Sequence, residues 1–333
     1  MNVRLNNLRG PMIGVGSPVV DQIARVPENF LKTVGGEKGG MELVDAETLE
    51  RLLASVPEKP LFAPGGSAGN TAFAMARLGV PSRFLGAIGA DEAGAFYRNT
   101  FQTIGGDDRA FRIQKDLPTA RCLSLVTPDG ERTMRTHLGA AMTLAPEHIS
   151  PEDFGGCVHA HVEGYLLFNP DLMRHVLTAA KAAGCTVSVD LASFEVVQAS
   201  HTLLPELLSE FVDIVFANEE EAEAFAGATD PEACRDSLGQ FCDTVAVKIG
   251  AEGALLRRGD ETCRVPAIPV DRVVDTTGAG DLWAAGFLFG ILNDYPLEKC
   301  GACGAALGGA VVTLEGATLP EPIWNRLREQ VVA

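Results

Sequence analysis

The sequence predicts an α/β protein whose mostly parallel central sheet is covered by helices on both faces. The main observation is that strand-like apolar runs alternate with helical patterns from residue 158 onward, which is typical of βαβ units. A similar order of strands and helices precedes residue 104. Two β-type or irregular stretches, 21–63 and 119–138, interrupt this pattern and predict a smaller, β-rich part.

In the first half of the chain, hydrophobic periodicity and turn residues define the elements. The predicted extended segments are 12–20, 23–26 and 83–88. The predicted helices are 46–54, 67–78 and a segment that ends near residue 104. The second of these has the clearest limits, because Gly65 and Gly66 precede it while Gly79 and Pro81 follow it.

The rest of the chain contains two hairpins and the alternating elements. One hairpin pairs 120–126 with 132–136 around the turn sequence Thr-Pro-Asp-Gly at 127–130, and the other pairs 254–257 with 261–265. The predicted strands between them are 160–166, 186–190, 214–217 and 244–249. The predicted helices are 170–183, 195–210, 219–226, 282–292, 297–313 and 321–330.

The two interruptions, 21–63 and 119–138, each leave the α/β body and return to it. We expect them to meet as a lid over the carboxyl edge of the sheet, where open α/β sheets bind ligands. No internal repeat or linker divides the chain, so residues 1–333 are predicted to form a single domain with this lid.

Composition excludes several classes of function. The formal net charge of −17 argues against a general nucleic-acid binder and against docking on an anionic membrane. No apolar run approaches the ~20 residues that span a bilayer. The segment MNVRLNNLRG and the glycine- and proline-containing run after it are typical of a strand and turn rather than a signal peptide. We therefore expect a cytoplasmic protein.

Eight cysteines lie in apolar or helical contexts, and we expect them to be reduced and mostly buried. Cys300 and Cys303 have the spacing of a metal or redox pair, but no second such pair accompanies them, which favours a structural role. His159 and His161 lie in a strand-like stretch without an obvious third ligand, and we interpret them in the same way.

The segment Asp275-Thr-Thr-Gly-Ala-Gly-Asp281, followed by an apolar helix, is the most informative motif. Free amides at a helix start form an anion site, and glycines let a phosphate approach the backbone. An acid within such a site is suited to take a proton from a hydroxyl that attacks the bound phosphate. The alternative interpretation of Asp281 is an ordinary helix cap.

Three further motifs combine glycine or asparagine with a carboxylate or a polar side chain. They are Gly-Val-Gly-Ser-Pro-Val-Val-Asp at 14–21, Gly-Gly-Ser-Ala-Gly-Asn at 65–70 and Asn-Glu-Glu-Glu at 218–221. Taken singly, each has a structural alternative: a turn, a close helix contact with a serine cap, and a solvated helix start. Together with residues 275–281 they form a pattern.

This pattern resembles the ribokinase/PfkB carbohydrate kinase superfamily over essentially the whole chain. Within it, the motifs at 14–21 and 65–70 and the stretch 213–225 are most similar to adenosine kinase and its bacterial relatives. One departure concerns ribokinase, which usually has lysine where this chain has Ser67. The resemblance implies a ribokinase-like three-layer α/β/α body with a small β-rich lid, and an ATP-dependent phosphotransferase that acts on an alcohol group.

The resemblance also implies roles for individual residues. Asp281 would be the base, and the amides of Gly278, Ala279 and Gly280 would bind the transferring γ-phosphate. Arg132, at the mouth of the first hairpin, is either a phosphate clamp or a solvated charge.

For the nucleotide, Asn218 and Glu221 would organise the phosphates and the Mg²⁺ of ATP, with Glu221 acting through water. The segment containing Lys248, Gly250 and Gly253 resembles the adenine-nucleotide side, where the glycines let the backbone approach ATP.

For the acceptor, Asp21, Gly66, Ser67 and Asn70 match positions that hold hydroxyl groups, a set that suits a ribose-like diol. Phe194 would either stack on a base or belong to the core.

A monovalent cation such as K⁺ is implied beside the anion site, at Asp275 and Thr277 with the loop around Gly316.

The sequence therefore predicts a kinase of a nucleoside, most similar to adenosine, or of a sugar such as ribose, fructose or 2-keto-3-deoxygluconate. A nucleotide-binding regulator without catalysis is an alternative, which the intact Asp281 disfavours. A Rossmann-type dehydrogenase is disfavoured because Val19 stands where the third glycine of its motif belongs. Monomer and homodimer both remain open.

Overall fold

A computed structural model describes residues 10–129 and 131–332 of the chain. Its larger sheet has nine strands in the order β14-β13-β12-β11-β10-β9-β1-β5-β6. The strands from β12 to β6 run parallel, whereas β13 and β14 are antiparallel additions at one edge. Their bounds are β1 (Met12–Val15), β5 (Ser82–Gly89), β6 (Phe111–Gln114), β9 (His159–Glu163), β10 (Thr186–Asp190), β11 (Ile214–Asn218), β12 (Thr244–Lys248), β13 (Ala254–Arg258) and β14 (Glu261–Val265).

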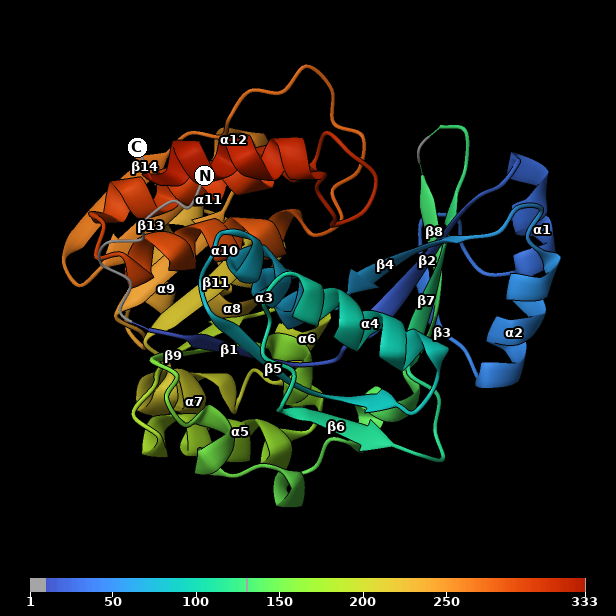
Figure 1. The fold of residues 1–333 in the computed structure, drawn as a ribbon. Helices are drawn as coiled ribbons and strands as arrows, with labels where there is room; N and C mark the ends of the chain where they lie inside the picture. Colours follow the sequence, from blue (N-terminus) through green and yellow to red (C-terminus); the bar gives the residue numbers. More distant parts are fainter. Residues whose placement is uncertain (1–9, 130, 333) are drawn as a thin grey trace.

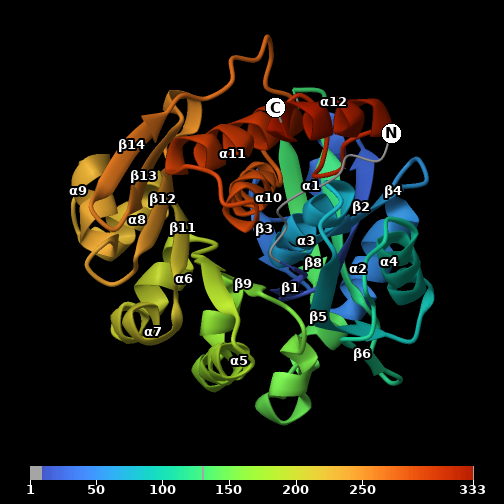
Figure 2. The ribbon, with the colours of Figure 1, turned by 60° about the vertical axis from the view of Figure 1, so that its left-hand side comes forward.

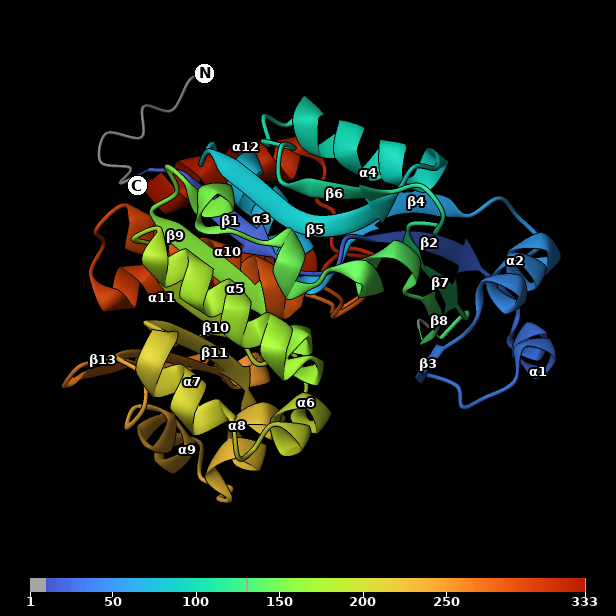
Figure 3. The same ribbon diagram turned by 90° about the horizontal axis from the view of Figure 1, so that it is seen from below.

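Helices cover both faces of this sheet (Figure 1, Figure 3). One face packs against α5 (Pro170–Ala182), α6 (Phe194–Ala199), α7 (Leu204–Phe211), α8 (Glu219–Ala226) and α9 (Pro231–Leu238). The other packs against α3 (Ser67–Arg77), α4 (Glu92–Thr103), α10 (Ala279–Leu292), α11 (Leu297–Val311) and α12 (Glu321–Val332). In β1, Ile13 points to the helix layer that contains α5, and Met12 points to the layer that contains α10, because successive side chains of a strand face opposite sides of a sheet. The predicted three-layer α/β class is confirmed.

A second sheet is built from the two segments that interrupt the α/β pattern. Its strand order is β3-β8-β7-β2-β4, and it projects from one side of the body (Figure 1). The strands are β2 (Val19–Arg25), β3 (Met41–Leu43), β4 (Leu61–Gly65), β7 (Ala120–Val126) and β8 (Arg132–His137). The helix α2 (Ala46–Ser55) and the single turn α1 (Leu31–Val34) pack on its outer face. The inner face is turned toward the edge of the large sheet.

The structure corrects several predicted elements. The extended segment 12–20 divides at Gly16–Pro18 into β1 and β2, which belong to different sheets. The helix predicted at 195–210 is two helices, because Pro205 cannot donate within a continuous helix but fits the first turn of α7. The strand predicted at 160–166 ends at Glu163, where a 3-10 helix (Gly164–Phe168) begins. The residue Gly130 of the predicted 127–130 turn lies outside the described residues, as do residues 1–9 of the N-terminal segment.

The chain has other elements that the sequence did not indicate. Examples are β6 and the helix α9, although the Asp230 cap before Pro231 is an ordinary helix-start signal. Further 3-10 helices are Glu28–Phe30, Gly139–Thr143, Pro146–His148, Pro151–Phe154 and Gly250–Glu252. None of the helices formed by residues 10–129 and 131–332 combines the length and hydropathy that crossing a bilayer requires.

All eight cysteines are free thiols, and only Cys263 among them is not fully buried. Cys300 and Cys303 lie on α11, which packs closely against α10 (Figure 2). The backbone carbonyl of Cys303 leaves no room for a side chain at Gly286, since a Cβ there would lie 2.3 Å from it. The spacing of these two cysteines therefore reflects helix packing.

Candidate active site

A cavity of about 1550 Å³ lies between the carboxyl edge of the large sheet and the inner face of the second sheet. This exceeds the usual volume of a single-ligand pocket, so the cavity has room for two ligands side by side. It brings together most of the residues that the sequence predicted for the site. These are Asp21, Gly66, Ser67, Asn70, Asn218, Glu221, Lys248, Gly250, Gly253, Thr277, Gly278, Ala279, Gly280 and Asp281.

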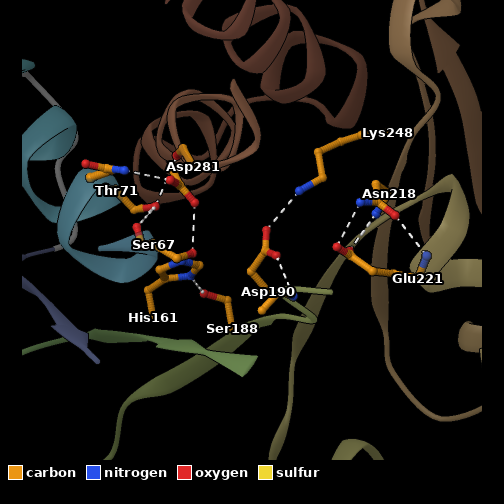
Figure 4. A network of polar contacts seen from close by, with 11 residues as sticks. Ser67, Thr71, His161, Ser188, Asp190, Asn218, Glu221, Lys248 and Asp281 are labelled. Atoms are coloured by element: carbon orange, nitrogen blue, oxygen red, sulfur yellow. Dashed lines mark hydrogen bonds and ion pairs between the residues drawn. The ribbon is translucent and has the colours of Figure 1, made fainter. Parts of the chain in front are cut away.

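Asp281 lies in the first turn of α10 and faces this cavity. Its two carboxylate oxygens accept hydrogen bonds from Ser67 Oγ (Figure 4) and from Asn70 Nδ2, each at 2.8 Å. Thr71 Oγ1 donates to its backbone carbonyl at 3.0 Å. Burial, together with the negative charge of Asp190, raises the pKa of Asp281 to about 6. The side chain is therefore a carboxylate at neutral pH that binds a proton readily.

Ser67 and Asn70 reach Asp281 from the helix α3, which begins directly after Gly66. Gly66 has φ of 89°, and a Cβ there would lie 2.1 Å from the carbonyl oxygen of Ser17. The sequence predicted that Ser67 and Asn70 hold hydroxyls of the acceptor. Here both position the carboxylate of Asp281, more than 200 residues away in the chain.

Gly278 precedes α10 in the left-handed conformation, with φ of 73°. The first amides of a helix have no acceptor within it, which makes this turn an anion site. The amide of Ala279, however, donates to Thr276 O at 3.1 Å. Of the three predicted amides, one is thus used inside the turn, and Gly278 and Gly280 are better placed to serve a ligand.

A buried ion pair faces this turn. Lys248 Nζ contacts Asp190 Oδ2 at 2.9 Å, and a Cβ added to Gly280 would lie 3.0 Å from the same ammonium (Figure 4). Burial would lower the pKa of Lys248, but the negative charges of Asp190 and Glu221 outweigh the effect of burial, so the pKa is raised. Burial would raise the pKa of Asp190, but Lys248 reverses this and lowers it. Both groups are therefore charged, and a fixed positive charge lies beside the anion site.

Asn218 and Glu221 form a reciprocal cap at the start of α8. Asn218 N and Nδ2 donate to the carboxylate of Glu221, and Glu221 N donates to Asn218 Oδ1, all at 2.8 Å. The motif is thus a helix start, but not the solvated one of the structural alternative, because Glu221 is buried and lines the cavity with Asn218. Burial, together with the charge of Asp190, raises the pKa of Glu221 to about 7.

Within residues 10–129 and 131–332, no three His, Cys, Asp or Glu side chains converge as a cage for a metal ion. A magnesium ion that arrives with ATP needs only one or two protein carboxylates, since phosphates and water supply its other ligands. Glu221, which lines the cavity with Asn218, fits this requirement.

Asp21 lies on β2, on the inner face of the second sheet. Burial raises its pKa to about 6, Arg132 opposes this rise, and the charges of Asp275 and Asp281 add to it. The registers Asp21↔Cys122 and Cys122↔Thr136 place three of the inner-face side chains in one row. Asp21 is therefore the carboxylate that the second sheet presents to the cavity.

Part of the cavity lining is apolar. It comes from β3, β8, the residue after β8 and two 3-10 helices, and its members are Met41, Leu43, Met134, Leu138, Met142 and Phe168. Phe168 and Met142 are 64% and 70% exposed although they line a cavity. These residues, which we call the apolar roof, were not identified from the sequence. Their segments lack a motif, and only pairing of β3 with β8 aligns Met41 with Met134.

Arg132 and Asp275 do not line the main cavity but a smaller hollow beside it. Arg132 Nη1 pairs with Asp275 Oδ2 and donates to Thr277 Oγ1 at 2.7 Å. The side chains of this pair are 10% and 6% exposed, so Arg132 is not the solvated charge that the sequence allowed.

Phe194 also departs from the prediction. It is the first residue of α6, is 38% exposed, and does not line the cavity. The neighbouring Ala192, in the left-handed region with φ of 69°, lines the cavity in its place and turns the chain away. Stacking of Phe194 on a base is therefore not supported by this arrangement.

Sequence reasoning missed Glu163, a buried acid at the end of β9. It accepts from Ser17 N at 2.9 Å and from Ala68 N at 3.3 Å, and so holds the Gly16 and Gly66 turns together. Burial raises its pKa to about 7. An acid after a strand-like run was its only signal.

His159 and His161 are buried in the same strand, where both bond to Ser188 Oγ at 2.8 Å.

Comparison with known proteins places this geometry in context. The family model "pfkB family carbohydrate kinase" matches residues 45–324. The chain is 32% identical to the aminoimidazole riboside kinase of Salmonella typhimurium over 293 residues, covering 82% of this chain and 90% of that one. It is similar to the crystal structure of adenosine kinase from Sinorhizobium meliloti, with TM-score 0.85, 34% identity and coverage of 97% and 99%. It is equally similar to a probable sugar kinase from Rhizobium etli, with TM-score 0.87, 32% identity and coverage of 98% and 100%.

Proposed function

The chain belongs to the pfkB family of carbohydrate kinases, and we propose that its acceptor is a nucleoside. Its activity is ATP-dependent phosphorylation of a hydroxyl on a nucleoside or sugar, as predicted. The choice between the two acceptors rests on the apolar roof.

Free sugars carry hydroxyls on nearly every face, and each buried hydroxyl needs a polar partner. The roof offers methionine, leucine and phenylalanine instead, and several of these are exposed within a concave surface. A nucleobase has broad apolar faces that such side chains bind well. This is the observation that carries the proposal. The aminoimidazole riboside kinase and adenosine kinase to which the chain is similar are, by name, kinases of nucleosides.

Polar groups are concentrated below the roof. The Asp21 carboxylate can accept from two vicinal hydroxyls, and Asn70 can both donate and accept. With Gly66 leaving space beside them, these residues would hold the ribose of the nucleoside. The phosphorylated hydroxyl would then point toward Asp281.

Asp281 would take the proton of that hydroxyl. The hydroxyl oxygen forms a bond to the γ-phosphorus of ATP, the bond from this phosphorus to the β,γ-bridging oxygen breaks, and ADP leaves. With a pKa near 6, Asp281 is in its basic form at neutral pH and matches the requirement for a general base.

The charge that develops on the transferring phosphoryl group would be stabilised by fixed donors. We assign the amides of Gly278 and Gly280 and the ammonium of Lys248 to this role, because they border one corner of the cavity. Gly250 and Gly253 would let the backbone lie against ATP. Mg²⁺, held near Glu221 and Asn218, would supply charge neutralisation of the phosphates.

The second sheet would act as a lid that closes over both ligands. It supplies Asp21 and half of the apolar roof, so it would contact the acceptor directly. Closure would exclude water, which otherwise competes with the acceptor for the phosphoryl group. Residues 21–63 and 119–138 thus belong to the active site of the same single domain.

An acceptor panel tests the proposal. ATP consumption with Mg²⁺ is measured for adenosine, inosine, guanosine, ribose, fructose and 2-keto-3-deoxygluconate, with Asp281→Asn as the blank. We expect nucleosides to be turned over, and Phe168→Ala to raise their KM by about tenfold through lost roof contact. Ile113→Ala, at an exposed position outside the cavity, is the matched control. Turnover of sugars alone would contradict the nucleoside assignment.

A further inference from the structure

The guanidinium of Arg132 lies where the sequence resemblance implies a monovalent cation. Asp275 and Thr277 are the implied ligands, with the loop around Gly316. In the structure, Arg132 Nη1 contacts both Asp275 Oδ2 and Thr277 Oγ1. Its Nε donates to Ser124 Oγ at 2.7 Å, so the guanidinium is held through two of its nitrogens.

The Asp275 carboxylate has its hydrogen-bonding positions filled. Oδ1 accepts from the amide and the hydroxyl of Thr277, at 2.9 and 2.8 Å. Oδ2 accepts from Gly316 N at 2.7 Å and from Arg132. A carboxylate has about four acceptor positions, so a metal ion could bind here only by displacing one of these donors. The residues present do not fit a monovalent cation site.

Arg132 places a positive charge at this position, in a buried ion pair with Asp275. After burial, the charges of Asp275 and Asp281 raise the pKa of Asp21, and Arg132 is the cation that opposes this rise. Burial would raise the pKa of Asp275. The hydrogen bonds from Gly316 and Thr277 and the charge of Arg132 outweigh the effect of burial, so the pKa is lowered. Asp275 is therefore an anion, and Arg132 neutralises it.

We propose that Arg132 takes the place of a monovalent cation and orders the turn that binds the γ-phosphate. Arg132 is a positioning residue: it fixes Asp275 and Thr277, and Thr277 leads directly into Gly278. The charge is supplied by β8 of the second sheet, so it belongs to the chain and does not depend on the salt. The enzyme should consequently work without K⁺ or Na⁺.

The first experiment uses the wild-type protein. The rate with ATP, Mg²⁺ and an accepted substrate is measured in potassium, sodium and tetramethylammonium chloride at one ionic strength. Tetramethylammonium is too large to enter a cation site. We expect rates that agree within about twofold, whereas activation by K⁺ of about fivefold or more would overturn the inference.

The second experiment removes the guanidinium. Arg132→Met keeps an unbranched apolar stem but frees Asp275, and we expect a slower enzyme that K⁺ activates about fivefold or more over tetramethylammonium. K⁺ should also raise the Tm of this variant but not of the wild type, because a ligand stabilises the state that binds it. Arg25→Ala, which breaks the exposed Arg25–Glu315 pair at the same junction, should remain insensitive to K⁺.

An Arg132→Met protein whose rate and Tm are the same in both salts would overturn the inference, since no cation position would have been opened. The rate readout rests on the proposed function, but the Tm readout does not require turnover. A wrong acceptor would leave the Tm result intact and is thus distinguishable. If Arg132→Met does not fold, the response of the wild-type Tm to K⁺ decides, because a rise would show a vacant cation site.

Discussion

Asp275 and Asp281 lie at the two ends of one seven-residue segment, and their carboxylates have opposite surroundings. Asp275 is bonded to two amides, a hydroxyl and the Arg132 guanidinium, and its pKa is lowered. The Asp281 carboxylate accepts from two neutral donors, Ser67 and Asn70, and burial raises its pKa to about 6. At neutral pH one acid is therefore an anion that holds the turn, while the other is able to accept a proton.

The largest expected effect is a loss of activity when the Asp281 carboxylate is removed. Asp281→Asn keeps the shape but replaces one acceptor oxygen by an amide donor and removes the base, so kcat should fall by about 10²–10⁴-fold. ATP binding, measured by calorimetry, should be retained, since the amides and Lys248 are unchanged. A variant with more than about a tenth of the wild-type kcat would refute the assignment of Asp281 as the base.

The second effect is a loss of stability when the Asp275 carboxylate is removed. Asp275→Asn leaves Arg132 buried without its counter-charge, and the free energy of unfolding should fall by about 3 kcal/mol. Urea unfolding at neutral pH measures this. Glu315→Gln is the matched control, because it breaks an exposed ion pair worth less than about 1 kcal/mol. Equal losses in the two variants would mean that burial of the Asp275 pair has no energetic weight.

The third effect is a gain of stability for Asp281→Asn, in contrast to the loss expected for Asp275→Asn. The pKa of Asp281 is above its value of 3.8 in the unfolded chain, so its contribution to stability is complete below that value and is lost as pH rises through about 6. Asp281→Asn mimics the protonated form. It should be more stable than wild type by about 1–2 kcal/mol at pH 8, a reduced figure because the group faces a hydrated cavity, and equally stable near pH 4.

The behaviour of Asp275 with pH should be the reverse. Its pKa is lowered, so its contribution is present above the ordinary value and is lost as pH falls. Urea unfolding of both variants and of wild type across this range would compare the two acids directly. A gain for Asp281→Asn that does not change with pH would contradict this explanation.

The smallest effect concerns the donors of Asp281. Ser67→Ala removes a hydrogen bond that favours the carboxylate, so the pKa of the base should rise by less than about one unit. The acid limb of the pH profile of kcat/KM should move upward accordingly. Thr71→Val removes a hydrogen bond to the backbone carbonyl of Asp281 only, and its profile should not move.

Local patterns carried much of the prediction. Alternating strands and helices indicated the α/β class, and the limits of α3 and α10 were predicted to within a few residues from their glycines. The motifs at 65–70, 218–221 and 275–281 each lie next to a helix start that lines the cavity. Parallel topology accounts for 218–221, which follows β11, whereas 65–70 follows β4 of the second sheet and 275–281 follows the connection after β14. Errors arose where a short segment lacked a pattern, as at β6, or where one proline divided a helical run, as at Pro205.

The sequence by itself determined the class of fold, the family and the chemical groups available, because these depend on periodicity and on motifs within a few residues. Only the tertiary structure decided which groups meet. Arg132 reaches Asp275 across 143 positions, and Asn70 reaches Asp281 across 211. Whether a carboxylate is saturated with donors or left as a base depends on these distant contacts and on burial, which sequence spacing does not specify.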